Sequence, residues 1–218
     1  SFYLGAKSVC PEVTMKVQFT GSWYDENGEK NAAQALIAAG CDLISQHADS
    51  LGAPTACEDA NIPNVSYNGS TYEHGENTFL VSSAINWAPY FELLIKSVVE
   101  GKEIPADYTG SIVTGSVVLS GLNLDVIADG TVDAVKTAIA GFKAGTLHVY
   151  DVTKENFITK DGAPITTYMA DVDTDAAYTP DHEAIVNGYF DESNSSTHRS
   201  APYFDIRIDG IELLNEKF

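Results

Sequence analysis

Aromatic and polar side chains follow four predicted strands of the sequence, at the point where each strand ends. They are, in chain order, Trp23, Tyr24, His47, Asp49, Asn68, Asn86 and Trp87. In an open parallel sheet, ligands bind outside the carboxyl ends of the strands. Indole and phenol rings stack on flat ligands, while carboxylate, amide and imidazole groups hydrogen-bond polar edges. The pattern therefore predicts that these seven residues bind a flat ligand with polar edges.

Several of these residues also fit a purely structural role. Trp23 or Trp87 would suit a core position, because tryptophan is highly buried on average. Asp25, which follows the first pair of aromatics, would suit the N-terminal cap of a helix. Asn68 and Gly69 would suit an ordinary turn. The binding interpretation is favoured because all four strand ends carry such groups.

The sequence shows no recognisable arrangement for catalysis. The patterns G-x-S-x-G, H-E-x-x-H and the P-loop do not occur. His47 and Asp49 lie two residues apart, but no nucleophile is evidently paired with them. The acidic segment 171–182 resembles the start of a calcium loop, but Ala176 and His182 occupy positions that require Gly and Glu. We therefore predict a protein that is not an enzyme and has no catalytic residues, metal site or cofactor.

Composition restricts the partners of the chain. Its 218 residues are 44% hydrophobic, which suffices for one core and a small appendage. Acidic residues outnumber basic ones 31 to 12, giving a formal net charge of -19. Such a surface repels phosphate backbones and anionic lipid headgroups, so we predict no nucleic-acid binding and no peripheral membrane binding. The three cysteines have no CxxC spacing and indicate neither a disulfide framework nor a zinc site.

Strands and helices alternate over the first 150 residues, which predicts an α/β fold: a three-layer αβα domain around a parallel sheet. From about residue 147, short apolar runs alternate with Asp, Gly, Thr and Ser, which predicts a small β-rich C-terminal appendage over 151–218, packed on the same domain. We expect a hairpin turn at 160–162 and a strand over 203–214. The other expected strands are 13–20, 42–46, 64–67, 78–84 and 111–119, and the expected helices are 1–9, 31–39, 53–60, 89–100 and 129–144.

The strand-end motifs resemble those of a known family. The runs SWYD, SQHADS, YNGS, INWAPYF and GSVVLSGLN follow one another in the order found in the basic membrane protein family of ABC-transporter substrate-binding lipoproteins. The resemblance covers residues 1 to about 150. It implies one lobe of the type I periplasmic-binding fold, in which two α/β lobes joined by a hinge of three crossings hold the ligand between them. Known members bind purine nucleosides or purine bases and deliver them to a membrane transporter.

The resemblance also implies a domain organisation. Residues 1–150 correspond to the C-terminal lobe, within which 84–105 correspond to the hinge and a helix that belongs to the other lobe. The chain opens inside a predicted helix, so we expect the N-terminal lobe of the same protein to be missing from it. An ABC transporter permease would be the protein partner. The full-length protein would be extracytoplasmic and lipid-anchored to the bacterial cell membrane.

Six of the seven strand-end residues match family motifs directly: Trp23 and Tyr24 match SWYD, His47 and Asp49 match the QH-x-DS run, and Asn86 and Trp87 match a W-N-W pattern. Two positions depart from the family pattern. Asn68 stands where nucleoside binders place an Asp that holds ribose hydroxyls, and Ile85 stands where relatives place Trp or Lys. A free base and another small polar ligand therefore remain alternatives to a nucleoside.

The sequence as a whole predicts the solute-binding component of a bacterial ABC importer, with a purine nucleoside or base as ligand and only half of the binding site present. The alternative is the ligand-sensing domain of a signalling receptor or of a lac-repressor-like regulator. A lone lobe makes half of the ligand contacts, so we expect this chain alone to bind weakly. Apolar surface around Tyr90, Phe91 and Leu94 would be left bare and could support self-association.

Overall fold

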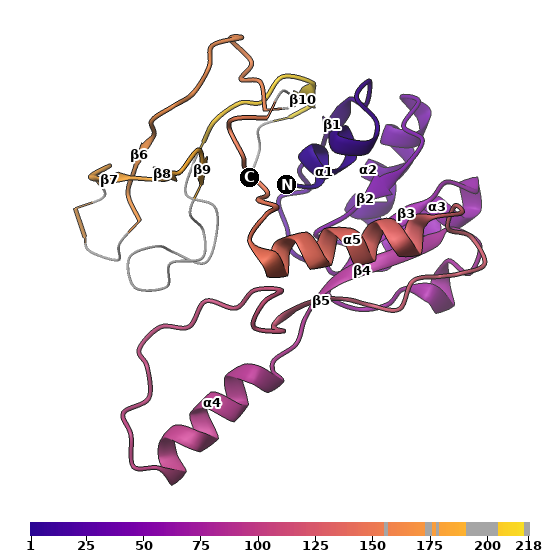
Figure 1. Ribbon diagram of the computed structural model, residues 1–218. Coiled ribbons are helices and arrows are strands. Elements are labelled where there is room, and N and C mark those ends of the chain that lie inside the picture. Colours follow the sequence, from indigo (N-terminus) through magenta and orange to yellow (C-terminus); the bar gives the residue numbers. More distant parts are fainter. Residues whose placement is uncertain (155–156, 173–175, 178, 191–204, 216–218) are drawn as a thin grey trace. The chain divides into compact units, whose positions relative to one another are not determined.

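The computed structural model describes residues 1–154, 157–172, 176–177, 179–190 and 205–215 (Figure 1). The described helices are α1 (Phe2–Val9), α2 (Glu26–Ala38), α3 (Gly52–Ala60), α4 (Ala88–Val99) and α5 (Thr131–Ala144), with a short 3-10 helix η1 (Tyr72–His74). The strands are β1 (Met15–Val17), β2 (Ile44–Ser45), β3 (Asn64–Tyr67), β4 (Phe79–Ile85), β5 (Val117–Leu119), β6 (Met169–Ala170), β7 (His182–Glu183), β8 (Ile185–Val186), β9 (Tyr189–Phe190) and β10 (Ile211–Leu213). The predicted α/β class is confirmed. None of the described helices is both long and apolar enough to cross a membrane.

The chain divides into two compact units. Unit 1 consists of Ser1–Met15, Ala88–Thr114 and Gly141–Glu212, and unit 2 consists of Lys16–Trp87, Gly115–Ala140 and Leu213–Phe218. The main sheet lies in unit 2 and has the order β2-β3-β4-β5 (Figure 1). Strands β2, β3 and β4 are parallel, as predicted, and β5 is antiparallel to β4. Strand β1 was expected to open this parallel sheet, but it pairs with β10 near the end of the chain.

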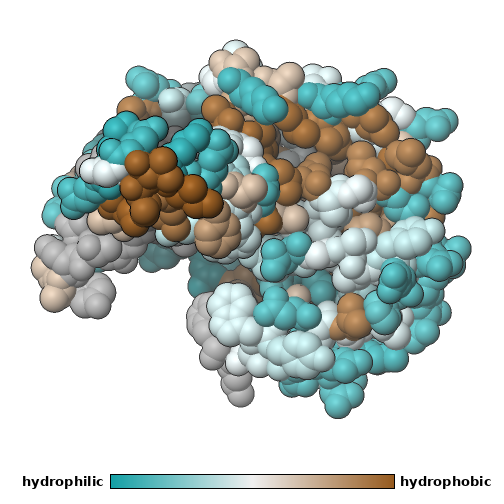
Figure 2. Space-filling view, turned by 90° about the horizontal axis from the view of Figure 1, so that it is seen from below, coloured by the Kyte–Doolittle hydropathy of each residue, from teal (hydrophilic) through white to brown (hydrophobic). Residues whose placement is uncertain are grey.

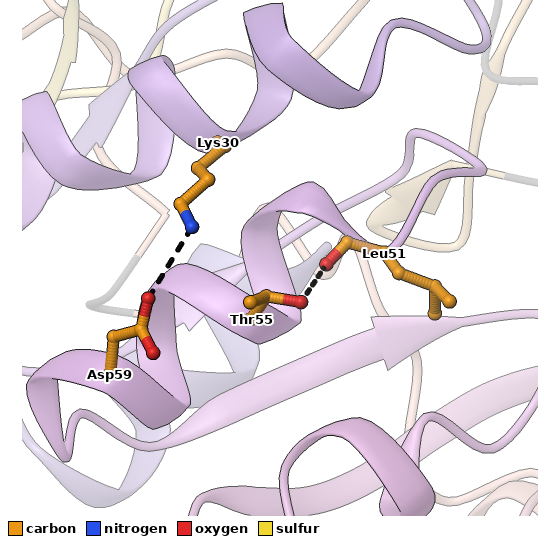
Figure 3. Close-up of polar contacts among 4 residues, drawn as sticks. All are labelled: Lys30, Leu51, Thr55 and Asp59. Carbon is orange, nitrogen blue, oxygen red and sulfur yellow. Dashed lines mark hydrogen bonds and ion pairs between the residues drawn. The ribbon is translucent and has the colours of Figure 1, made fainter.

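Helices α2 and α3 pack on each other through small side chains. Their buried residues include Ala32, Ala33, Ala53, Ala56 and Cys57. Gly52 begins α3 so close to α2 that a Cβ there would overlap the carbonyl oxygen of Glu26. At the surface of this contact, Lys30 of α2 reaches Asp59 of α3 at 3.4 Å, and the Thr55 hydroxyl donates to the Leu51 carbonyl at 2.7 Å (Figure 3). Small side chains thus allow the close approach of the two helices.

A carboxylate at the end of α3 holds the segment that leads into β4. Glu58 accepts hydrogen bonds from the Asn77 backbone N–H at 3.2 Å and from the Thr78 hydroxyl at 2.8 Å. Partial desolvation acts to raise the pKa of Glu58. Hydrogen bonds from the Asn77 side chain, the Thr78 hydroxyl and the Asn77 backbone outweigh it, so the net pKa is lowered. These donors favour the charged form of the carboxyl group, which therefore supports the folded state at neutral pH.

The two faces of the main sheet differ in burial. Ser66 and Ser82, which are paired across β3 and β4, are buried. On the other face, Ile85 of β4 is paired with Val117 of β5, and the two are 45% and 42% exposed. Hydrophobic side chains are visible as brown areas on the molecular face drawn in Figure 2. Unit 2 thus leaves apolar side chains uncovered at the β4–β5 end of its sheet.

Unit 1 builds its core from both ends of the chain. Tyr3 and Leu4 of α1 are buried together with aromatic and aliphatic residues of the C-terminal region: Tyr150, Phe157, Ala170, Val172, Ala184, Ile185, Phe190 and Ile208. The Tyr3 hydroxyl donates to the Asp209 carbonyl at 2.8 Å. Gly210 has φ +86° and a Cβ there would overlap the Tyr3 hydroxyl. The first helix therefore belongs to the same core as the β-rich region, which local sequence patterns did not indicate.

The β-rich region differs in detail from its prediction. Four of its described strands form two short antiparallel pairs, β6-β7 and β8-β9, and the fifth, β10, pairs with β1. A turn forms at 160–162, where the Gly162 N–H donates to the Thr159 carbonyl at 2.8 Å. The predicted hairpin is wrong, because Thr159 bridges to Ile208 and not to a neighbouring strand. Of the strand expected over 203–214, β10 is present from Ile211 to Leu213, and residues 203–204 lie outside the described residues.

Candidate functional site

All seven predicted site residues belong to unit 2. Strands β2, β3 and β4 end at Ser45, Tyr67 and Ile85, so the three loops that follow these parallel strands leave one edge of the sheet. We call this edge, together with the loop that follows β1, the rim. The described residues contain no group of three or more His, Cys, Asp or Glu side chains able to hold a metal ion.

The rim aromatics are solvent-exposed. Trp23 is 77% exposed, Tyr24 64% and Trp87 56%. The alternative that either tryptophan serves as a core residue is therefore wrong. Large aromatic side chains rarely remain this exposed together without a binding role, since their burial against a partner is strongly favourable.

The loop after β1 is fixed at its end by the first turn of α2. The Asp25 carboxylate accepts from the Gly28 N–H at 2.9 Å, which confirms the predicted cap. This cap makes α2 begin at Glu26, five residues before the predicted start at Asn31, because the polar residues in between are helical. Capping fixes the direction in which the chain leaves Tyr24.

A buried carboxylate joins this loop to the next one. Glu29 is 3% exposed, and its two oxygens accept from the Asp25 N–H at 3.0 Å and from the Ser50 N–H at 3.2 Å. The Asp49 N–H adds a hydrogen bond to the Trp23 carbonyl at 2.8 Å. The loops after β1 and β2 are therefore joined by one direct hydrogen bond and by one bond from each loop to Glu29 of α2. Sequence reasoning missed Glu29, although an acidic residue in the first turn after a capping Asp is a signal for such a role.

The loop after β2 is held by its own side chains. Gln46 donates from Nε2 to the carbonyls of Ala48 at 3.2 Å and Ser50 at 3.1 Å. The ring of His47 stacks on that of Tyr67 at the end of β3, with centroids 4.6 Å apart and planes 20° apart. His47 is exposed on the rim, and stacking on Tyr67 orients its ring.

The loop after β3 is a tight turn. Asn68 has φ +65°, in the left-handed region that Asn tolerates, and its N–H donates to the Ser83 carbonyl at 2.6 Å. The Ser82 hydroxyl donates to the Gly69 carbonyl at 2.6 Å. Both bonds attach the turn to β4. The predicted turn is confirmed, and the exposed Asn68 side chain remains available to a ligand.

A row of buried polar side chains connects the same turn to the neighbouring strands. Asn64 donates from Nδ2 to the Ile44 carbonyl at 3.2 Å, and its Oδ1 accepts from the Ser66 hydroxyl at 2.6 Å. Ser66 also lies 2.6 Å from the Thr71 hydroxyl. Because a serine hydroxyl has one proton, Thr71 donates to Ser66. The row links β2, β3 and the turn, and sequence reasoning missed it, because isolated Asn, Ser and Thr residues carry no local signal.

The segment after β4 has two different side chains. Asn86 bonds through its N–H to the Ser116 carbonyl at 2.8 Å and through Nδ2 to the Gly115 carbonyl at 3.0 Å. These bonds engage the amide group of Asn86 in the fold. Trp87, the next residue, is exposed and precedes α4. In this structure Asn86 thus acts as an anchor, while the side chain of Trp87 is largely exposed.

The chain is similar in sequence to known substrate-binding proteins. The family described as "ABC transporter substrate-binding protein PnrA-like" matches residues 1–137. A purine-binding protein of Brucella abortus is 37% identical over 101 residues, which are 46% of this chain and 29% of that protein. A putative ABC transporter glucose-binding protein of Haloferax volcanii is 36% identical over 112 residues, 51% of this chain and 29% of that protein. The chain thus spans under a third of the length of either relative.

A solved structure supports the fold. An ABC transporter solute-binding protein from Conexibacter woesei superposes with a TM-score of 0.56 at 19% identity, covering 66% of this chain and 49% of that one. This likeness confirms the predicted periplasmic-binding fold class. The family model covers well over half of the chain, and its members are substrate-binding proteins, which confirms the prediction that the chain is not an enzyme. The chain belongs to the PnrA-like family of ABC transporter substrate-binding proteins.

Proposed function

We propose that the protein is the solute-binding component of a bacterial ABC importer, that its ligand is a purine nucleoside or purine base, and that this chain supplies one half of the site. The observation that carries the proposal is the exposure of Trp23, Tyr24 and Trp87 on loops that are themselves fixed. Fixed loops lower the entropy cost of binding, and exposed rings supply stacking surface. A purine ring suits this surface because it is flat and has polar edges.

The ligand class rests on the strand-end side chains and on the Brucella relative, whose name gives purine as its ligand. The Haloferax relative is named for glucose, and sugars also pack on indole rings, so glucose is the competing ligand. Asn68 has an amide where nucleoside binders place a carboxylate. An amide both donates and accepts, so it accommodates ribose hydroxyls less specifically than an Asp does.

We further propose that residues 1–150 form the C-terminal lobe, with 84–105 as hinge and inter-lobe helix and 151–218 as an extension packed on the lobe. The surface of α4 supports this organisation. Phe91, Ile95 and Val98 have the spacing of one helical face and are 53%, 64% and 67% exposed. An apolar helical face of this size normally packs on a protein partner. The N-terminal lobe of the same protein is the proposed partner, and self-association through Tyr90, Phe91 and Leu94 is the alternative when that lobe is missing.

The protein partner and the location follow from the same proposal. A substrate-binding protein of an importer delivers its ligand to a permease and works outside the cytoplasm. We propose a lipid anchor for the full-length protein. The sequence upstream of these residues tests this: a signal peptide with a lipobox Cys supports the importer, and a helix-turn-helix would indicate a regulator instead.

Calorimetry on the full-length protein tests the ligand. The panel is adenosine, guanosine, inosine, adenine, hypoxanthine and glucose. Tight binding of at least one purine supports the proposal, whereas tight binding of glucose alone contradicts the purine class. Nanomolar binding by the 218-residue chain alone would contradict the half-site.

Two substitutions test the rim itself. Trp23→Ala and Trp87→Ala should each weaken binding by about 10- to 100-fold, because each removes a stacking surface. The matched control is Leu124→Ala. Leu124 is 70% exposed but lies beside Asn123, whose N–H bonds to Leu80 near the opposite end of β4. If the Trp23→Ala and Trp87→Ala variants bind the ligand as tightly as the Leu124→Ala control does, the rim is not the binding site.

A further inference from the structure

The last described residues of the chain contact the strand that leads into the rim. Strand β10 pairs with β1, and the Leu214 N–H donates to the Val17 carbonyl at 2.9 Å. These residues of β10 lie beyond residue 137, where the match to the family ends. The contact is therefore a feature of this chain that the family match does not describe.

The next residue extends the pairing with its side chain. Asn215 Oδ1 accepts from the Phe19 N–H at 2.8 Å, and Asn215 Nδ2 donates to the Phe19 carbonyl at 2.9 Å. Opposite residues in an antiparallel ladder exchange the same two bonds. An amide side chain carries the donor and the acceptor on separate atoms, in the same planar group as a peptide bond, and so matches both backbone groups. Asn215 is half-buried, so water competes only in part for these bonds.

Phe19 is the last fixed point before the first rim loop. Four residues further on is Trp23, and Gly21 between them has φ +71°. Within the loop, the Ser22 hydroxyl donates to the Tyr24 carbonyl at 3.0 Å, and the Trp23 carbonyl accepts from the Asp49 N–H at 2.8 Å. The far end of the loop is tied down by the capped first turn of α2 and by Glu29. The bond pair at Phe19 fixes the near end.

We propose that Asn215 is a positioning residue for ligand binding: by holding both backbone groups of Phe19, it sets the loop that presents Trp23 and Tyr24. The C-terminal segment thereby becomes a structural part of the rim, although it contributes no side chain to the ligand. This role rests on the proposed function, since it assigns Asn215 to the same site.

The test compares three variants of the full-length protein. Asn215→Ala removes both bonds, Asn215→Asp keeps an acceptor and loses the donor, and Asn215→Gln keeps both groups on a longer side chain. The control is Asn31→Ala, which removes an exposed amide from α2. Amide hydrogen exchange of residues 19–24 and acrylamide quenching of Trp23 fluorescence, in a Trp87→Phe background, report on the loop without any ligand. Calorimetry with the purine panel reports on binding, and thermal unfolding reports on the fold as a whole.

We expect Asn215→Ala to speed exchange at 19–24 and to weaken purine binding, each by about tenfold, as the loss of one or two partly buried hydrogen bonds implies. Asn215→Gln should restore part of both losses, and the unfolding midpoint of Asn215→Ala should fall by no more than a few degrees relative to the control, so the fold as a whole is kept. Unchanged exchange and quenching in Asn215→Ala would overturn the proposal, as would a loosened loop with unchanged affinity. If no purine binds the unsubstituted protein, the proposed purine ligand fails, while exchange and quenching still decide whether Asn215 holds the loop.

Discussion

Glu29 is the buried carboxylate that joins two loops of the rim, so its replacement by alanine removes a defined support. The side chain is 3% exposed, and its oxygens accept from the backbone N–H groups of Asp25 and Ser50. Glu29→Ala would leave both donors without this acceptor, at about 1–3 kcal/mol each. Removing the carboxylate also removes the cost of burying it. We therefore expect a net loss of about 2 kcal/mol, and a smaller loss of about 1 kcal/mol for Glu29→Gln, which keeps one acceptor oxygen.

Hydrogen exchange at the backbone amides of Asp25 and Ser50 measures this loss of stability directly. A loss of about 2 kcal/mol corresponds to roughly 30-fold faster exchange at these two amides, and urea unfolding should report a loss of the same order. Gln34→Ala is the control, because Gln34 is exposed on the same helix. If Glu29→Ala stays within about 0.5 kcal/mol of the control and the two amides exchange at their original rates, Glu29 does not hold the loops together.

Three further predictions concern the scaffold of unit 2. Gly52→Ala should destabilise the protein by about 1–3 kcal/mol in urea unfolding, because its Cβ would overlap the backbone of α2, whereas Gly121→Ala, with open space around its Cβ, should not. Glu58 has a lowered pKa, so its stabilising effect is present above the usual Glu pKa and is lost as the pH falls through the lowered value. Glu58→Gln should therefore flatten the acid limb of the stability profile, by less than about 1 kcal/mol because the group is partly exposed. Burial, opposed by a weaker hydrogen bond from Asn64, raises the pKa of Cys57 to about 11, so iodoacetamide at pH 8 should label the exposed Cys10 quickly and Cys57 only after unfolding, as mass spectrometry would show.

The elements of the parallel sheet were predictable because their signals are local. The apolar runs that became β2, β3 and β4 and the helical spacing of α3 and α4 each lie within about a dozen residues, and the structure contains all five elements. The partner of β1 was not predictable in this way. Its pairing strand lies near residue 211, and nothing in the alternation of 13–20 indicates whether the strand joins a sheet neighbour close in sequence or far from it.

The residue types of the rim were predictable, but its supports were not. Strand ends in a parallel sheet meet at one edge, so His47, Asn68 and Trp87, which follow β2, β3 and β4, could be grouped from the order of the strands alone. Trp23 follows β1, which pairs with β10, and a hydrogen bond from Asp49 to its carbonyl joins it to this edge. Glu29 bonds to a backbone group 21 positions away, and Asn215 to one 196 positions away. The first-turn position of Glu29 after a capping Asp indicates its bond to Asp25, but nothing in the sequence indicates the distant partners Ser50 and Phe19, because these are defined only by the fold.

The supports of the rim share one property that bears on ligand choice. Glu29, Gln46, Ser82 and Asn215 all bond to backbone atoms of the loops and not to the exposed aromatic side chains. The loop positions therefore depend little on which side chain each loop carries. Under the proposed function, substitutions of the exposed rim side chains would change the ligand contacts while these backbone bonds still hold the loops.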